Sequence, residues 1–251
     1  MTRTPLLSLD RFTVTRGSFT LGPITVAFDP GERVAVLGAN GAGKSTTLLG
    51  MAGQLFPHEG EVRWSGHSVG SIARPDRQGL GFLPDQMPGF GWMTVREHCE
   101  FLSGFYRTWD PEWMNELHAR LGLPWDTRLA GLSRGMRVKL GFCCTEAYRP
   151  PILLLDEPTT GLDPVIRGDL VRLLETVCPV GGDRLLLYST HLIEDVDRLA
   201  TRILVIHGGR LAHDVSRHAL ADRYPGLTGI DAIRSLLEDH DTIPVAPTDS
   251  A

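Results

Sequence analysis

The most constraining feature of the sequence is a glycine-rich segment that lies between an apolar run and a helix-forming run. Residues 38–46 read GANGAGKST and match the phosphate-loop spacing G-x-x-x-x-G-K-[ST]. Residues 33–37 before them are typical of a short buried strand, and residues 45–52 carry helix formers and no proline. A strand, a glycine turn and a helix in this order favour an α/β fold whose turn cradles phosphate groups.

This segment predicts a nucleotide site. Glycine has no Cβ, so backbone N–H groups can curl around phosphate oxygens, and the following helix directs its positive end at the same anion. Lys44 is expected to pair with the β and γ phosphates, and the Ser45 hydroxyl to bind Mg²⁺. The predicted nucleotide contacts are Gly38, Ala39, Asn40, Gly41, Ala42, Gly43, Lys44, Ser45 and Thr46. A turn that binds nothing is the alternative, and the flanking strand and helix count against it.

Length and composition narrow the class of protein. The chain has 251 residues, 42% of them hydrophobic, which suits one large α/β domain with a lobe. Its formal net charge of −5 gives no electrostatic case for nucleic acid as the main partner. No apolar run reaches the length of a membrane span, and the first residues lack a secretion signal. The four cysteines form no C-x-x-C pair, which favours free thiols over a metal or redox site.

The rest of the chain predicts one domain and a short tail. Strands are expected at residues 6–14, 24–28, 60–64, 79–83, 152–155 and 184–188, followed by a hairpin over residues 203–213. The runs 152–155 and 184–188 are apolar throughout, as in strands buried on both faces of a parallel sheet. We expect a domain over residues 6–238 and a disordered tail over residues 239–251.

Residues 84–135 predict a helical lobe inserted into the α/β core. Helices are expected at residues 94–106 and 111–121, with Thr94 and Asp110 as their N-caps. Four of the five tryptophans fall in this region, namely Trp92, Trp109, Trp113 and Trp125. About half of them should form the core of the lobe, and the exposed remainder should supply a contact surface.

Two carboxylates complete the candidate site. Asp156 and Glu157 directly follow the run 152–155, so they lie at the carboxyl end of the sheet, where ligands of open α/β sheets bind. Asp156 is expected to hold Mg²⁺, directly or through water, and Glu157 to polarise the water that attacks the γ-phosphate. A solvated strand end is the alternative for the pair alone, and the phosphate loop upstream strengthens the functional interpretation.

A second anion site is predicted at residues 132–136, which open a helix that runs to about residue 148. Ser133 can cap this helix, and the N–H groups of its first turn point at the same place. The phosphate loop already serves one nucleotide, so a second site suits the nucleotide of another subunit. An ordinary capped helix is the alternative.

Together these motifs resemble the ATP-binding subunit of an ABC transporter. Their order matches that family: the phosphate loop 38–46, the loop 81–86, the signature 132–136, Asp156-Glu157, the dimer loop 161–164 and the histidine of 189–191. The resemblance implies a phosphate-loop NTPase core with a mostly parallel sheet, an antiparallel β subdomain and an inserted α-helical lobe. It also implies ATP and Mg²⁺ as cofactors and ATP hydrolysis as the activity.

The resemblance further implies a dimer of cassettes, identical or different. They are expected to pack head to tail, so that each ATP lies between one subunit's phosphate loop and the other subunit's Ser133 and Gly135. Asp163 is expected to reach across the dimer. His191 is expected to hold the γ-phosphate and the attacking water, and it joins Lys44 and Glu157 in the catalytic set.

The signature and the loop after residue 83 depart from the family pattern. Arg134 stands where glycine is usual, and it either adds a charge near the shared nucleotide or lies in solvent. Met136 stands where glutamine is usual and loses a polar contact. Asp85 stands where the glutamine that contacts Mg²⁺ and the membrane partner is usual, with Gln86 next, so either residue can take that role.

The residue that stacks on adenine is not evident. Arg16 falls near the expected position, and Phe12, Phe19 or the Arg16 guanidinium can take this role.

The family resemblance implies a cytosolic ATPase, peripheral on the inner face of the membrane, that powers a separate permease. The tryptophan-rich lobe, the stretch 105–110 and the basic signature are similar to export cassettes for drugs, antibiotics or lipids, so an exporter is expected. The exposed aromatics of the lobe, with Asp85 and Gln86 beside them, are expected to receive a helix of the permease.

Three other functions compete with this expectation. The first is a cassette that does conformational work on a membrane complex without moving solute. The second is a soluble ABC-type ATPase acting on DNA or ribosomes, which usually carries coiled coils, zinc modules or tandem cassettes that this sequence lacks. A regulator that binds nucleotide without hydrolysis is the third, and the joint presence of Lys44, Asp156, Glu157 and His191 counts against it. The sequence does not name the transported solute.

Overall fold

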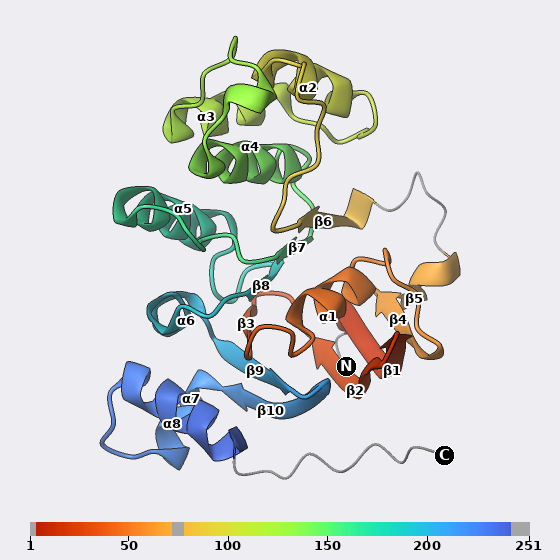
Figure 1. The fold of residues 1–251 in the computed structure, drawn as a ribbon, viewed down its shortest axis with the longest axis vertical. Coiled ribbons are helices and arrows are strands. Elements are labelled where there is room, and N and C mark those ends of the chain that lie inside the picture. Colours follow the sequence, from red (N-terminus) through yellow and green to blue (C-terminus); the bar gives the residue numbers. More distant parts are fainter. Residues whose placement is uncertain (1–3, 72–77, 242–251) are drawn as a thin grey trace.

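The computed structural model describes residues 4–71 and 78–241, which form two sheets flanked by helices (Figure 1). The strands are β1 (Leu7–Arg16), β2 (Phe19–Phe28), β3 (Arg33–Leu37), β4 (Glu59–Trp64), β5 (His67–Ser68), β6 (Leu80–Leu83), β7 (Ile152–Leu155), β8 (Leu185–Ser189), β9 (Arg202–His207) and β10 (Arg210–Ser216). The helices are α1 (Lys44–Met51), α2 (Val95–Ser103), α3 (Pro111–Leu121), α4 (Arg134–Glu146), α5 (Pro164–Val177), α6 (Ile193–Leu199), α7 (Arg217–Arg223) and α8 (Gly229–Asp241).

The larger sheet carries the predicted phosphate-loop core. Its strand order is β10-β9-β3-β8-β7-β6, and β9, β3, β8, β7 and β6 run parallel to one another in it. Every residue of β7 and β8 is buried, as the apolar runs predicted, because helices cover the sheet faces. Only the β9–β10 hairpin at one edge is antiparallel, so the predicted mostly parallel sheet is confirmed.

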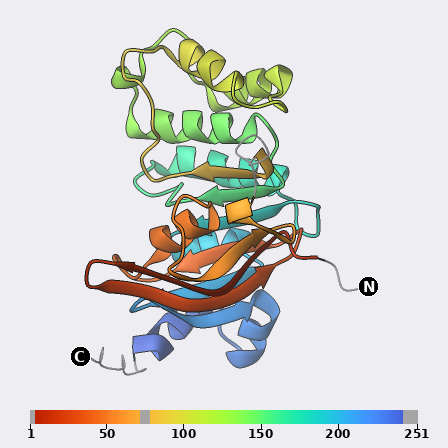
Figure 2. The ribbon, with the colours of Figure 1, turned by 90° about the vertical axis from the view of Figure 1, so that its right-hand side faces the viewer.

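The smaller sheet is antiparallel, with the order β2-β1-β4-β5, and it lies beside α1 (Figures 1 and 2). Its inner residues share a core with α1 and with one face of the larger sheet. Phe12 is fully buried in this core, and a Cβ added at Gly50 would lie 2.1 Å from its ring. This sheet is the antiparallel β subdomain that the family resemblance implied.

The helical lobe is formed by α2, α3 and α4, which lie between β6 and β7 in the chain and at the top of Figure 1. Thr94 caps α2 through a reciprocal pair with Glu97, in which each side chain accepts from the other's backbone N–H, at 3.2 and 2.8 Å. Asp110 caps α3 by accepting from the Trp113 N–H at 2.9 Å. Both predicted caps are confirmed, and α4 extends the lobe beyond the expected boundary at residue 135.

The four lobe tryptophans divide between core and surface. Trp109, Trp113 and Trp125 are partly buried and pack against the core of the lobe and sheet. Trp92 keeps 66% of its surface exposed. Three of the four rings therefore pack against the core and one lies on the surface, whereas the sequence led us to expect about half of them in the core.

A buried ion pair joins the lobe to the sheet. Glu146, at the end of α4, accepts two hydrogen bonds from the Arg184 guanidinium, each 2.7 Å long. Glu146 is 1% exposed, so its charge depends on this bidentate partner. The pair connects the last turn of α4 to the residue that precedes β8.

The cysteines and the end of the chain complete the description. All four cysteines are buried free thiols, and burial raises the pKa of Cys178 to about 11. No helix in the described part of the chain is long and apolar enough to cross a membrane. The helix α8 ends at Asp241, so the boundary expected at residue 238 falls inside it. The rest of the expected disordered tail, residues 242–251, lies outside the described residues.

Candidate functional site

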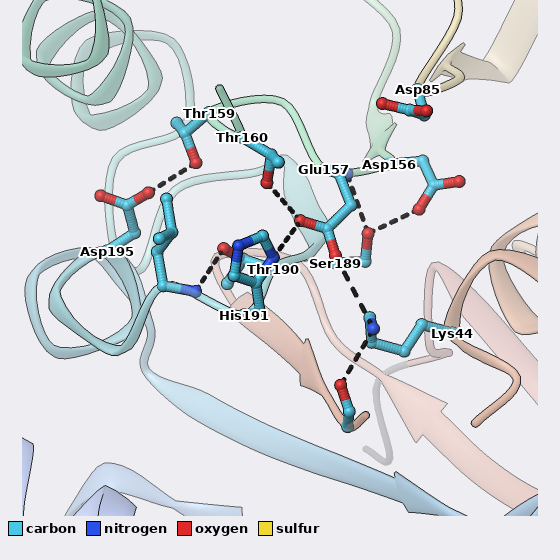
Figure 3. Close-up of polar contacts among 12 residues, drawn as sticks. Lys44, Asp85, Asp156, Glu157, Thr159, Thr160, Ser189, Thr190, His191 and Asp195 are labelled. Atoms are coloured by element: carbon cyan, nitrogen blue, oxygen red, sulfur yellow. Dashed lines mark hydrogen bonds and ion pairs between the residues drawn. The ribbon is translucent and has the colours of Figure 1, made fainter. Parts of the chain in front are cut away.

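The candidate site lies where three neighbouring strands of the larger sheet end (Figure 3). In this sheet β3 pairs with β8 and β8 pairs with β7, all in parallel. Their carboxyl ends therefore lie at the same edge, and the loops that follow them meet there. These loops carry Gly38–Thr46, Asp156–Glu157 and Thr190–His191, segments far apart in the sequence.

The phosphate loop takes a shape that only glycine permits at two points. Gly38 has a φ of 152°, and a Cβ there would lie 2.2 Å from the carbonyl oxygen of Ile206. Gly43 has a φ of 116° and is the N-cap of α1. It has no side chain to cap the helix, so the first N–H groups of α1 stay open to a ligand. An uncapped helix start next to a lysine suits a polyphosphate.

Lys44 directs its ammonium group into the loop. The side chain is 7% exposed, and Nζ donates to the carbonyl oxygens of Gly38, at 2.9 Å, and Ala39, at 3.2 Å. Nζ also lies 3.7 Å from Glu157 Oε1. The cation thus lies between the phosphate loop and the carboxylate predicted to act as a base.

Asp156 is held by two hydroxyl groups. Its Oδ1 accepts from Ser45 Oγ at 3.1 Å and from Ser189 Oγ at 2.6 Å. Asp156 is 6% exposed, and it forms no ion pair with any residue that the structure describes. A buried carboxylate beside a serine hydroxyl, with its charge not otherwise balanced, fits Mg²⁺, which prefers oxygen ligands.

Glu157 is fixed in direction by three neighbours. Its φ is 49°, a left-handed conformation that costs a non-glycine residue about 1 kcal/mol or more. Its N–H donates to Ser189 Oγ at 2.9 Å, and its Oε2 accepts from Thr160 Oγ1 and lies 3.0 Å from His191 Nδ1. Strain of this kind persists where surrounding contacts impose it, and it aims the carboxylate at Lys44 and His191.

Ser189 and Thr160 were missing from the predicted site. Ser189 bonds both Asp156 and the Glu157 backbone, and Thr160 bonds the Glu157 side chain. The only sequence signal for Ser189 was its position two residues before His191, at the end of an apolar run. Thr160 carried no signal, because its contact depends on the turn that follows Glu157.

The loop residues enclose a cleft with a volume of about 430 Å³. It is lined by Arg16, Phe19, Asn40, Gly41, Gly43, Lys44, Ser45, Thr46, Asp85 and Glu157. Asp85 therefore borders the cleft, and it also lines a second cavity, next to the start of α4, whose lining includes its neighbour Gln86; Gln86 does not line the cleft itself. Phe19 and Arg16, which close the β1–β2 hairpin, line the cleft wall, whereas Phe12 lies in the core.

Six predicted nucleotide contacts are absent from the lining of this cleft: Gly38, Ala39 and Ala42 of the phosphate loop itself, and Ser133, Gly135 and Asp163 at the starts of two other helices. Ser133 caps α4 by accepting from the Met136 N–H at 3.3 Å, and Gly135 is in the first turn of that helix. Asp163 caps α5 by accepting from the N–H groups of Val165 and Ile166. Within one chain Ser133, Gly135 and Asp163 act as helix starts.

Arg134 makes a contact that neither sequence alternative included. Its side chain is 55% exposed, yet Nη2 donates to Asp85 Oδ1 at 3.1 Å within the same chain. Arg134 and Asp85, the two charged residues that we noted in the sequence as departures from the family pattern, are therefore paired with one another.

Comparison with known protein families agrees with this geometry. The family model described as ABC transporter matches residues 21–160. This match covers more than half of the chain and runs from β2 through the phosphate loop to Asp156-Glu157.

Three curated relatives illustrate the similarity. The ABC transporter ATP-binding protein YxlF of Bacillus subtilis, described as uncharacterised, is 32% identical over 72% of this chain and 60% of its own length. Nod factor export ATP-binding protein I of Sinorhizobium fredii is 33% identical over 88% of this chain and 64% of its own length. Thiamine import ATP-binding protein ThiQ of Cereibacter sphaeroides is 33% identical over 88% of this chain and 97% of its own length. The chain thus spans less than two thirds of the first two relatives.

A solved structure described as the ATP-binding subunit of an ABC transporter has the same fold. It superposes with a TM-score of 0.81 at 24% identity, covering 92% of this chain and 99% of that one. The expected fold class is confirmed by this likeness.

Proposed function

The chain belongs to the ABC transporter family, and from this premise we propose that it is an ATP-hydrolysing subunit that powers a separate membrane permease. The observation that carries this proposal is the arrangement of Glu157, 3.7 Å from the Lys44 ammonium and 3.0 Å from His191 Nδ1, at the edge of the cleft. Glu157 and Lys44 line the cleft, and His191 lies against Glu157, so that a base, a cation and a histidine are arranged in a way that suits attack of water on a terminal phosphate.

The phosphate end of ATP is assigned to the phosphate loop. Lys44 and the open N–H groups of α1 supply positive charge and donors to the β and γ phosphates. Ser45 and Asp156 would hold Mg²⁺, with Asp85 as a further oxygen ligand at the cleft wall. The ion would neutralise charge on the phosphate oxygens. Gln86 is not assigned to the ion, because it does not line the nucleotide cleft.

The hydrolytic step is assigned to Glu157. Its carboxylate takes a proton from a water molecule as the water oxygen attacks the γ-phosphorus and the bond to ADP breaks. Ser189 and Thr160 hold Glu157 in place. The Glu157 oxygen Oε2 that accepts from Thr160 is also the one that lies against His191 Nδ1. This arrangement favours an ATPase over a nucleotide-binding regulator.

Phe19 is the proposed adenine platform, because it lines the cleft and Phe12 is buried in the core. Phe19→Leu keeps an apolar side chain but removes the aromatic face, so ATP affinity should fall about 10-fold. Affinities measured by titration with ATP and with inorganic tripolyphosphate distinguish the contribution of the adenine end from that of the phosphate end. Tripolyphosphate has no adenine ring and should bind equally well to the wild type and to Phe19→Leu. If only Arg16→Ala weakens ATP binding, the guanidinium is the platform instead.

A second cassette is the first proposed partner. Ser133, Gly135 and Asp163 lie outside the chain's own cleft, as expected if they complete the site of a neighbouring cassette. ATP would then lie between two chains and close the pair, and hydrolysis would open it. The partner cassette can be a second copy or a different chain.

A membrane permease is the second proposed partner, and an exposed row of aromatic rings is its proposed contact. The row consists of Phe90, Trp92, Phe101 and Phe105, and is called the aromatic row below. Neighbouring ring centroids lie 5.8, 5.9 and 5.1 Å apart, so the rings form one continuous surface. Exposed aromatic surface supplies contact area at low entropy cost.

A groove that shares helix α2 with the aromatic row is the second part of the proposed contact. Its volume is about 440 Å³, and α2 contributes His98 and Leu102 to it while β6 contributes Phe82. Burial lowers the pKa of His98 below its usual value, so this wall is uncharged near pH 7. An amphipathic helix of the permease suits such a groove, because its apolar side can be buried there.

Substitution in the aromatic row tests the permease contact. Phe90→Asp and Trp92→Asp should each lower ATP-driven transport by about 10-fold or more, because each places a charge where apolar contact is needed. Transport is measured in membrane vesicles that hold the assembled transporter, and ATPase activity and thermal unfolding in the isolated subunit. Phe56→Asp, an equally exposed ring on the loop after α1, is the matched control. Unfolding of both row variants would mean that the rings are core and that the docking proposal is wrong.

Export is the proposed direction, and it rests on the similarity of the aromatic lobe and the basic signature to export cassettes. Relatives named for export and for import both match the chain, so family membership alone leaves the direction open. The proposed location is the inner face of the cell membrane, through the permease. Conformational work on a membrane complex without solute movement is the second candidate, and it would appear as ATP-dependent assembly without transport. The net charge of −5 disfavours a nucleic-acid partner.

A further inference from the structure

Arg134 is an unusual residue for its position in the fold. It is the first residue of α4, where the helix dipole presents partial positive charge. A cation at this point is unfavourable unless an anion lies beside it. Asp85 supplies that anion from the loop after β6, with Oδ1 at 3.1 Å from Arg134 Nη2. The two charges together restore the electrostatic balance at the start of the helix.

The Arg134 side chain also lies near a second segment. A Cβ built on Gly161 would lie 3.4 Å from Arg134 Nε and 3.5 Å from Cζ, so the guanidinium occupies the space beside the turn at Gly161. Gly161 has a φ of 71° and lies four residues after Glu157 in the sequence. Arg134 therefore lies beside the turn that follows the proposed base and pairs with Asp85.

These two neighbours relate the start of α4 to the nucleotide cleft. Asp85 and Glu157 both line the cleft, and Thr160, next to Gly161 in the sequence, bonds the Glu157 carboxylate. The ion pair is half exposed, at 55% for Arg134 and 45% for Asp85. A pair of this kind contributes little to global stability and is easily exchanged. The Arg134–Asp85 pair instead affects the position of the first turn of α4.

We propose that Arg134 is a positioning residue that acts within its own chain, holding the first turn of α4 against Asp85 and the Gly161 turn. Loss of either charge removes the ion pair that ties this turn to the loop after β6 and so loosens the start of α4, even when no nucleotide is bound; loss of Asp85 alone also leaves the Arg134 cation unpaired at the positive end of the helix. This role differs from a direct contact between Arg134 and a neighbouring subunit's nucleotide.

Hydrogen exchange in the nucleotide-free subunit tests the proposal. The Arg137 amide donates to the Ser133 carbonyl at 3.0 Å, and so reports opening of the first turn. Arg134→Gln and Asp85→Asn should each speed exchange at this amide about 2- to 5-fold, the range expected for an exposed ion pair. The double variant should be no faster than either single variant, because all three lack the same interaction. Arg134→Lys keeps the charge and should restore part of the protection.

The matched control is the Arg120–Glu116 ion pair on α3, whose two side chains are each 49% exposed. Arg120→Gln should leave exchange at Arg137 unchanged. Additive effects of Asp85→Asn and Arg134→Gln would mean that the residues act independently and would overturn the proposal. Unchanged exchange in both variants, with weaker ATP-driven dimerisation in Arg134→Gln alone, would assign Arg134 to the neighbouring nucleotide instead. Because exchange is measured without ATP, failure here leaves the proposed ATPase function untouched.

Discussion

Glu157→Gln should lower ATP turnover by about 10²–10⁴-fold, the usual loss when a general base is removed. The amide cannot accept a proton from water, although it keeps the size of the carboxylate and can still accept the hydrogen bond from Thr160. ATP binding should be retained, because Lys44 and the start of α1 are unchanged. The variant should therefore hold ATP without consuming it, and closed dimers should accumulate.

Three measurements check this expectation. Phosphate release gives turnover, titration gives ATP affinity, and gel filtration with ATP gives the dimer fraction. Glu175→Gln is the control, since Glu175 lies in a surface ion pair with Arg198, 2.7 Å away. The control should show wild-type turnover. If Glu157→Gln also turns over ATP at the wild-type rate, another group accepts the proton.

Lys44→Ala should weaken ATP binding by about 100-fold or more, because charge-assisted hydrogen bonds to phosphate are among the strongest polar contacts. The ammonium is 7% exposed and lies inside the cleft, where few water molecules can replace it. Its loss also leaves the Gly38 and Ala39 carbonyls without this donor. The backbone of the phosphate loop and the packing of α1 are otherwise unchanged, so the fold should survive.

Titration calorimetry with ATP measures the affinity, and thermal unfolding verifies the fold. Lys139→Ala is the control, since Lys139 is the only other lysine of the sequence and bonds the Leu121 carbonyl, away from the cleft. It should bind ATP as the wild type does. An unchanged affinity in Lys44→Ala would remove the phosphate loop from the proposed site.

Local patterns predicted most of the elements that carry the site. The strand at 33–37, the helix caps Thr94 and Asp110, and the apolar strands before Asp156 and at 184–188 are all present in the structure. Each of these depends on consecutive residues, because backbone preference and capping act over a few positions. The order of motifs along the chain was also sufficient to identify the family.

Contacts between distant segments were not predictable in the same way. Phe12 and Phe19 were equal candidates for the adenine contact in the sequence. In the structure the Phe12 ring is buried against Gly50 of α1, whereas Phe19, at the β1–β2 hairpin, lines the cleft. Asp85 and Gln86 are adjacent, yet Asp85 lines both the nucleotide cleft and the cavity next to the start of α4, whereas Gln86 lines only the second of these two cavities. Such outcomes depend on how whole elements pack.

The sequence by itself determined the phosphate loop, the strand that ends in Asp156 and Glu157, and the family, because these are encoded in short runs of residues. Only the tertiary structure decided that Ser189 bonds both Asp156 and Glu157, and that Arg134 pairs with Asp85. The physical reason is that side chains 33 or 49 positions apart meet only after strand register and helix packing have set their separation to a few ångströms.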